Sequence, residues 1–265
     1  MNSMLYIVAT PIGNLEDISL RALRVLGEVD FVLCEDTRVT GRLLDHYEIK
    51  TETISFHEHS DERKMKEVIG LLAAGKNLAL VSDAGTPGIS DPGGKLIERV
   101  IRELGDDVKI ESIPGPSAVT AALSISGIQT DKFVFLGFPP HKKGRQTFLR
   151  KILASEFPVV VYESKHRIIK FLDELKKLDE EPAGEDGEGE SGEIASRESR
   201  VANRYSGYKK DKSGKGSKKI STVVVCRELS KMHETVYRGG IGNIVEKIKS
   251  SQDDQKGEFV VIIGK

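Results

Sequence analysis

Acidic residues follow two of the short apolar runs in the first half of the chain. Glu35 and Asp36 come directly after one run, and Asp83 and Asp91 lie in a glycine-rich stretch after a later one. Carboxylates gathered in a crevice suit a cationic ligand, or a hydroxyl group that must lose a proton. For Asp36, an ion pair with Arg38 is nearly as good an interpretation as a catalytic role.

The glycine-rich stretch spans Ser82–Gly94 and reads SDAGTPGISDPGG. Glycine lets a ligand approach the main chain closely, and proline keeps a loop stiff. A P-loop is excluded because Leu96 follows Lys95 where a Ser or Thr would hold magnesium, and the G-x-G-x-x-G spacing does not follow the first strand. A plain connection rarely needs more than about six residues, so we favour a ligand-binding loop of another kind over a link without a ligand.

Apolar runs alternate with segments of helical periodicity, which is typical of βαβ units and a mostly parallel sheet. We predict an α/β protein with two α/β domains and a first domain over residues 1–116. Its predicted strands are Leu5–Ala9, Phe31–Cys34, Thr53–Phe56, Asn77–Val81 and Val108–Ile113, with helices over Asp17–Leu26, Gly41–Tyr47, Arg63–Ala74 and Lys95–Leu104. Loops that follow parallel strands meet at one edge, so Thr10–Asn14, Glu35–Arg38 and Ser82–Gly94 should lie together.

The second domain is predicted over residues 117–265, with a mixed sheet and a first helix, Ala118–Ser126, capped by Ser117. Its other predicted elements are strands Phe133–Leu136, Pro158–Tyr162, Ser221–Cys226 and Glu258–Ile263, and helices Thr147–Leu153, His166–Leu178 and Gly242–Ser250. The segment 179–219 is acidic and then basic, with few large apolar residues. It is predicted to be a disordered insertion; a basic arm that contacts RNA phosphates is the alternative.

Composition limits the remaining possibilities. The 265 residues carry a formal net charge of -1, so any nucleic-acid affinity must come from a local patch. Cys34 and Cys226 each lie in an apolar run, which favours buried, reduced thiols. His57 and His59 lie close together, but a loop entering a helix capped by Ser60 is a better interpretation than a metal site. The N-terminus has no basic leader or spanning apolar run, so we expect a soluble, cytoplasmic protein.

Six motifs in order resemble the tetrapyrrole (corrin/porphyrin) methylases, a family that uses S-adenosylmethionine. They are IVATPIGNLEDISLRA, VLCEDTRVTGRLL, SFHEHSDER, LVSDAGTPGISDPG, IPGPSAVTAALSISG and FLGFPP. The resemblance covers about Leu5–Leu178 and resumes over Thr222–Gly264, and the 179–219 insertion has no counterpart in the family. It is closest to the branch that methylates the ribose 2'-oxygen of a cytidine in 16S rRNA.

The resemblance implies a fold of two α/β domains, usually as a homodimer, with S-adenosylmethionine folded between the domains. The family's Gly-Asp-Pro triplet matches Gly85-Thr86-Pro87, where Thr replaces Asp and would offer a hydroxyl or backbone contact. The implied cofactor-binding residues are Ile12, Gly85, Thr86, Pro87, Ile89, Ser117, Ala118 and Glu163.

Methyl transfer from a sulfonium to oxygen needs in-line placement and a deprotonating hydroxyl, so positioning supplies much of the rate and a general base adds roughly 10²–10⁴-fold. The candidates for the base are Asp36, Glu35 and His57, with Arg38 as an orienting group or phosphate contact. Spacing does not choose among them.

A basic loop follows the Phe133–Leu136 run and offers RNA-binding candidates. It carries His141, Lys142, Lys143 and Arg145 beside the aromatic Phe138, and Lys165, His166 and Arg167 follow the next predicted strand. Basic residues beside an exposed aromatic suit contact with single-stranded RNA, although an ordinary solvated loop has the same composition. The expected partner is 16S rRNA within the small ribosomal subunit, with no membrane and no metal. A corrin or porphyrin C-methyltransferase and a non-catalytic ribosome-assembly factor are the competing functions.

Overall fold

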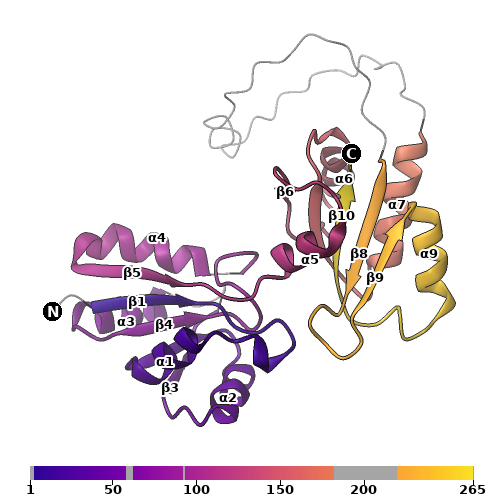
Figure 1. Ribbon diagram of the computed structural model, residues 1–265. Helices are drawn as coiled ribbons and strands as arrows, with labels where there is room; N and C mark the ends of the chain where they lie inside the picture. The colour runs from indigo at the N-terminus through magenta and orange to yellow at the C-terminus, as the bar shows by residue number, and fades with distance from the viewer. Residues whose placement is uncertain (1–2, 58–61, 92, 182–219, 265) are drawn as a thin grey trace, which may run out of the picture.

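The computed structural model describes residues 3–57, 62–91, 93–181 and 220–264. These residues form two α/β domains, each built on a five-stranded sheet. Figure 1 shows the first sheet with its helices at one end of the molecule, and the second sheet with its helices at the other. The chain passes between them through α5 (Ala118–Ser126). The prediction of two α/β domains is therefore confirmed.

The sheet of the first domain is parallel throughout, with the strand order β3-β2-β4-β1-β5. The central strands read as nearly unbroken apolar runs, as expected where helices cover both faces. The strands are β1 (Ser3–Val8), β2 (Phe31–Cys34), β3 (Glu52–Ser55), β4 (Leu78–Val81) and β5 (Val108–Ile113).

Helices pack against this sheet through two separate apolar clusters. One cluster joins α1 and α2 to the sheet, and the other joins α3 and α4 to it. The helices are α1 (Leu20–Glu28), α2 (Thr37–His46), α3 (Glu62–Ala73) and α4 (Gly93–Leu104), with short 3-10 turns η1 (Leu15–Asp17) and η2 (Gly105–Asp107). The sheet thus has buried faces on both sides, and its strand ends are left to form a site.

The second domain has a mixed sheet with the order β6-β7-β10-β8-β9, as predicted. Strand β6 pairs with β7 in parallel, while the remaining pairs are antiparallel. The strands are β6 (Val134–Phe135), β7 (Val159–Ser164), β8 (Thr222–Arg227), β9 (Thr235–Gly239) and β10 (Glu258–Gly264). The remaining helices are α6 (Arg145–Ala154), α7 (Ile168–Glu180) and α9 (Ile241–Ser250).

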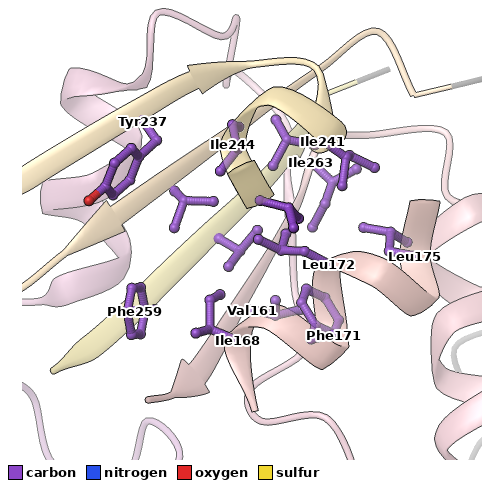
Figure 2. Close-up of a cluster of buried hydrophobic side chains, with 14 of the residues drawn as sticks. Val161, Ile168, Phe171, Leu172, Leu175, Tyr237, Ile241, Ile244, Phe259 and Ile263 are labelled. Atoms are coloured by element: carbon purple, nitrogen blue, oxygen red, sulfur yellow. The ribbon is translucent and has the colours of Figure 1, made fainter. Parts of the chain in front are cut away.

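The largest apolar core of the chain's second half lies between this sheet and helices α6, α7 and α9. Figure 2 shows Phe171 and Leu172 of α7 directed toward Val161 of β7, with Ile244 of α9 closing the other side. All four side chains are fully buried. A core of this kind fixes β7, whose last residues reach the site described below.

Several predicted helix and strand boundaries differ from those of the structure. Helix α2 begins at Thr37 instead of Gly41, because Asp36 caps it. Helix α4 begins at Gly93, so the glycine-rich loop is shorter than predicted. Strand β9 was not predicted at all. The predicted cap Ser60 and residues 182–219 of the predicted insertion lie outside the described residues, while α7 extends to Glu180.

The two cysteines are free and buried, as predicted. In the portions of the chain that the structure describes, no helix is both long and apolar enough to cross a bilayer.

Candidate functional site

The loops after β1 and β4 are joined by backbone hydrogen bonds at the carboxyl edge of the first sheet. Thr10 N donates to Gly85 O (2.9 Å), and Gly85 N donates to Thr10 O (3.1 Å). The Thr10 hydroxyl also donates to Ser82 O at 2.9 Å. Gly85 has φ +86, a left-handed conformation that side chains rarely adopt. The sequence therefore needs glycine here to bring the two loops together.

Further bonds fix the glycine-rich loop in one shape. The Asp91 carboxylate accepts from Gly88 N (2.5 Å) and Gly93 N (2.8 Å), which spans the loop and the start of α4. The Thr86 hydroxyl donates to Pro116 O at 3.1 Å, just before α5. The loop is therefore stiff, as its composition predicts, and it is tied to the connection between the domains.

A cavity of about 670 Å³ opens between this loop and the second domain. The volume is in the range of small-molecule and cofactor sites, roughly 300–1,000 Å³. Its lining from the first domain is Ile12, Glu35, Ser82, Asp83, Ala84, Gly85, Thr86, Ile89, Ser90 and Asp91. From the rest of the chain it is Ser117, Ala118, Phe138, Tyr162, Glu163, Ser164, Lys165, His166, Cys226, Glu228, Leu229, Lys231, Gly257, Glu258, Phe259 and Val260.

Most of the residues predicted to bind the cofactor meet at this cavity. Ile12, Gly85, Thr86, Ile89, Ser117, Ala118 and Glu163 all line it. Pro87 does not belong to the lining. Ile89 is about half exposed, at 48%, and it presents an apolar surface to a ligand. Ser117 stands at the predicted cap position of α5 but makes no side-chain capping bond, so its hydroxyl is not committed to the helix end.

The four catalytic candidates occupy different environments. Glu35 lines the cavity, whereas His57, Asp36 and Arg38 lie outside the lining. Asp36 caps α2, accepting from Arg38 N at 2.8 Å, and its Oδ2 lies 2.7 Å from Arg38 Nη2. The pKa of Asp36 is lowered to about 2, chiefly by the hydrogen bond from the Arg38 side chain and next by the hydrogen bond from the Arg38 backbone N–H. Asp36 and Arg38 therefore form the ion pair considered above, and Asp83, a neighbour whose Oδ1 accepts from Asp36 N, joins Glu35 in the lining.

Glu163 is the most buried acidic residue of the cavity, with 1% of its surface exposed. Its Oε1 accepts from Ser164 N at 2.8 Å and lies 2.8 Å from Arg167 Nε, while Arg145 Nη1 lies 3.9 Å from Oε2. Burial raises the pKa of the Glu163 carboxyl, against the opposing effects of Ser164 N–H and the two arginines. Among the described residues, Oε2 has no hydrogen-bond partner.

The basic loop, residues 137–144, stands beside the cavity. His141, Lys142 and Lys143 are exposed, and Phe138, 51% exposed, packs against Tyr162 with ring centroids 5.4 Å apart. Lys165 and His166 are exposed members of the cavity lining.

The assignment of Arg145 to an RNA surface is wrong, because the side chain is buried at 6% exposure. Arg145 begins helix α6 and turns its guanidinium inward toward Glu174, where Nε donates to Oε2 at 2.6 Å. Arg167 is half-buried, and its guanidinium also turns inward, toward Glu163 and Pro139 O. Charge alone does not tell a surface arginine from one that braces a loop.

The turn between β8 and β9 supplies cavity residues that sequence reasoning missed. Lys231 Nζ lies 3.0 Å from Glu228 Oε1 and 2.8 Å from Glu258 Oε2, and all three residues line the cavity. Ser230 of the same turn donates a hydrogen bond to Asp17 of the first domain. The signal was present in CRELSKMHETVYRG, but with β9 unrecognised the turn could not be placed at the site.

Comparisons with known proteins agree with this arrangement. The model of the tetrapyrrole (corrin/porphyrin) methylases matches residues 4–185. Ribosomal RNA small subunit methyltransferase I of Hydrogenobaculum sp. is 37% identical over 98% of this chain and 95% of its own length. The protein of that name from Thermotoga maritima is 35% identical over 98% and 97%, and that from Escherichia coli O157:H7 is 38% identical over 98% and 77%.

Solved structures support the fold alone. Cobalt precorrin-4 methyltransferase, a cobalamin biosynthetic enzyme, superposes with a TM-score of 0.61 at 16% identity, covering 98% of this chain and 94% of that one. Uroporphyrin-III C-methyltransferase of Thermus thermophilus gives a TM-score of 0.58 at 17% identity, covering 99% and 94%. With the family model matching more than half of the chain and relatives aligned almost end to end, the chain belongs to the S-adenosylmethionine-dependent tetrapyrrole (corrin/porphyrin) methylases, in the group of ribosomal RNA small subunit methyltransferase I.

Proposed function

We propose that this methyltransferase transfers the methyl group of S-adenosylmethionine to the ribose 2'-oxygen of a cytidine in 16S rRNA. The observation that carries the proposal is the position of the basic loop. Phe138 of this loop lines the same cavity as the glycine-rich loop, and exposed Lys142 and Lys143 follow it in the loop, while exposed Lys165 and His166 line the cavity themselves. A cationic rim with an exposed ring suits an RNA strand better than a flat tetrapyrrole, which would call for a roomy apolar acceptor site.

The cavity fits a cationic, partly apolar cofactor. Its lining holds six carboxylates, from Glu35, Asp83, Asp91, Glu163, Glu228 and Glu258, against the two lysines Lys165 and Lys231. Such a lining attracts a positively charged ligand. S-adenosylmethionine supplies a methyl group on a positively charged sulfur. Ile12 and Ile89 would contact its apolar surface, and Glu163 Oε2 would accept a hydrogen bond from one of its hydroxyl or amino groups.

Among the catalytic candidates, the cavity favours Glu35 as general base. It follows β2 directly and lines the cavity, where a carboxylate can accept the proton of an incoming hydroxyl. Asp83, two residues after β4, is the alternative in the same lining. Asp36 is already committed to capping α2 and to Arg38, and a base held by an arginine at a low pKa has little tendency to take a proton.

The cleanest test is the methylation state of 16S rRNA. Mass spectrometry of RNA from a strain lacking this chain should show the loss of one ribose methyl group, restored by the intact protein and not by Glu35→Gln. Purified small subunits and the protein, with methyl-labelled cofactor, should reproduce the transfer. An unchanged methylation map contradicts the proposal. Transfer to a precorrin instead of RNA would indicate a tetrapyrrole C-methyltransferase, and tight cofactor binding without transfer would indicate an assembly factor.

We also propose, from the family resemblance, that the protein acts as a homodimer and that its domains divide after residue 116. The first sheet uses residues up to Ile113, and the second begins at Val134. Light scattering on the purified protein would give the mass of 58.4 kDa for a dimer, twice 29.2 kDa.

A further inference from the structure

Two arginines hold the basic loop from inside the protein. Arg145 Nη1 donates to Pro140 O at 3.1 Å, and Arg167 Nη1 donates to Pro139 O at 3.0 Å. The two arginines therefore bind consecutive carbonyls just before His141, the first of the exposed basic residues of the loop. Charge-assisted hydrogen bonds of this kind are about twice as strong as neutral ones, so they fix the main chain at this point.

Glu163 is the direct partner of Arg167 and lies near Arg145, whose own direct partner is Glu174, with Arg145 Nε donating to Glu174 Oε2 at 2.6 Å. Glu163 Oε1 lies 2.8 Å from Arg167 Nε, and Glu163 Oε2 lies 3.9 Å from Arg145 Nη1. A buried carboxylate is tolerated only when its charge is compensated, and these guanidinium groups provide that compensation. Because Glu163 also lines the cofactor cavity, the loop and the cavity are built on the same side chain.

The base of the loop lies close to the first domain. A Cβ atom on Gly137 would lie 3.0 Å from Ser90 Oγ of the glycine-rich loop, and φ of Gly137 is +66. Gly137 O accepts from Tyr162 N at 3.0 Å. The basic loop thus starts in close contact with the glycine-rich loop, and the next residues of the basic loop are held by Arg167 and Arg145.

We propose that Arg145 and Arg167 are positioning residues for the RNA substrate. Held by Glu163 and Glu174, they set where His141, Lys142 and Lys143 stand relative to the cofactor, and they do not contact RNA themselves. The inference rests on the proposed function, since a loop position matters for RNA only if RNA is the substrate. It requires the planar fork of arginine, because a single lysine nitrogen cannot reproduce the contacts of Arg167 to Glu163 and to Pro139 O together.

The test asks, in the full-length protein, whether the arginines act through their positive charge alone or through the shape of the guanidinium group. Arg167→Lys keeps the charge and Arg167→Gln removes it, and Arg145→Lys repeats the first change at the second arginine. Both Arg167 variants should raise KM for small ribosomal subunits by about tenfold, the loss expected for a charge-assisted hydrogen bond. Arg167→Lys keeps a positive charge beside Glu163, so its Kd for S-adenosylmethionine should stay close to that of the wild type. The matched control is Arg150→Lys, an exposed arginine of α6.

Hydrogen exchange without RNA supplies the second readout. The amides of Phe138 and of residues 141–144 should exchange faster in Arg167→Lys and Arg145→Lys than in Arg150→Lys, while the core amides of β7 stay protected, which shows that the fold is kept. In binding titrations with small ribosomal subunits at several salt concentrations, Lys142→Gln and Lys143→Gln should weaken RNA binding and reduce its salt dependence, because each phosphate contact adds to that dependence.

The outcomes separate the inference from the proposed function. If Arg167→Lys binds like the wild type and only Arg167→Gln is weakened, Arg167 acts through its charge and the inference is wrong. The inference also fails if both arginine-to-lysine variants are unchanged while the lysine variants lose binding. If the lysine variants bind as well as the wild type, the RNA function of the loop itself fails.

Discussion

The side chain of Lys231 lies directly over Gly13, with its aliphatic carbons where a Cβ atom of residue 13 would stand. A Cβ built on Gly13 would be 2.3 Å from Lys231 Cγ and 2.9 Å from Lys231 Cε. Gly13 belongs to the loop after β1 and Lys231 to the turn between β8 and β9. One glycine thus lets the two domains close on the cavity.

Gly13→Ala is expected to weaken cofactor binding and to lower stability. Lys231 cannot move aside freely, because its ammonium group is held by Glu228 and Glu258. Overpacking of this kind costs roughly 1–3 kcal/mol. Calorimetric titration with S-adenosylmethionine and thermal unfolding would measure both effects. The matched control is Gly41→Ala in α2, where a Cβ meets no atom within 4 Å. It should stabilise by up to about 1 kcal/mol; equal behaviour of the two variants would contradict the contact.

Thr86→Val should destabilise the protein by about 1 kcal/mol, the usual net value of one hydrogen bond. The Thr86 hydroxyl donates to Pro116 O at 3.1 Å and ties the glycine-rich loop to the start of α5. Thr86→Ser keeps the donor and is the control. Urea unfolding of the three proteins measures the difference, and a Val variant as stable as the wild type would show that this bond contributes nothing.

Glu35→Gln is expected to lower kcat by roughly 10²–10⁴-fold, the range for loss of a general base. The Kd for S-adenosylmethionine should rise much less than kcat falls, since the amide has the same shape and the five other carboxylates of the lining remain. His57 lies outside the cavity lining, so the variant His57→Gln should retain activity. The rate of methyl transfer to small ribosomal subunits in a single turnover measures this loss. If Asp83→Asn is the damaging variant and Glu35→Gln is not, the base lies in the loop after β4 instead of the loop after β2.

The pH dependence of stability should report the Asp36–Arg38 pair. The folded pKa of Asp36 is lowered from 3.8 to about 2, so the folded state binds fewer protons than the unfolded state between these values. The stabilisation is therefore complete above about pH 5 and is lost as pH falls through 3.8 toward 2. Asp36→Asn keeps a capping oxygen and removes the charge. Its difference from the wild type in urea unfolding should be constant from pH 7 to 5 and shrink from pH 5 to 3; a constant difference throughout would contradict the assignment.

The sequence by itself determined the fold class and most of the elements, with β9 the strand that it missed. The strand Phe31–Cys34, the strand Val108–Ile113 and the helix Ala118–Ser126 have the predicted bounds, because local periodicity and turn residues decide such segments. It also located the glycine-rich loop, since a left-handed position such as Gly85 leaves a compositional mark.

Only the tertiary structure decided which polar side chains share the cavity. Glu35 and Asp36 are neighbours in sequence, yet one lines the cavity and the other caps α2. Lys142 and Arg145 look alike as basic loop residues, yet one is exposed and the other is buried beside Glu174. Burial and ion pairing depend on partners that are distant along the chain, and spacing in a single sequence carries no record of those distances.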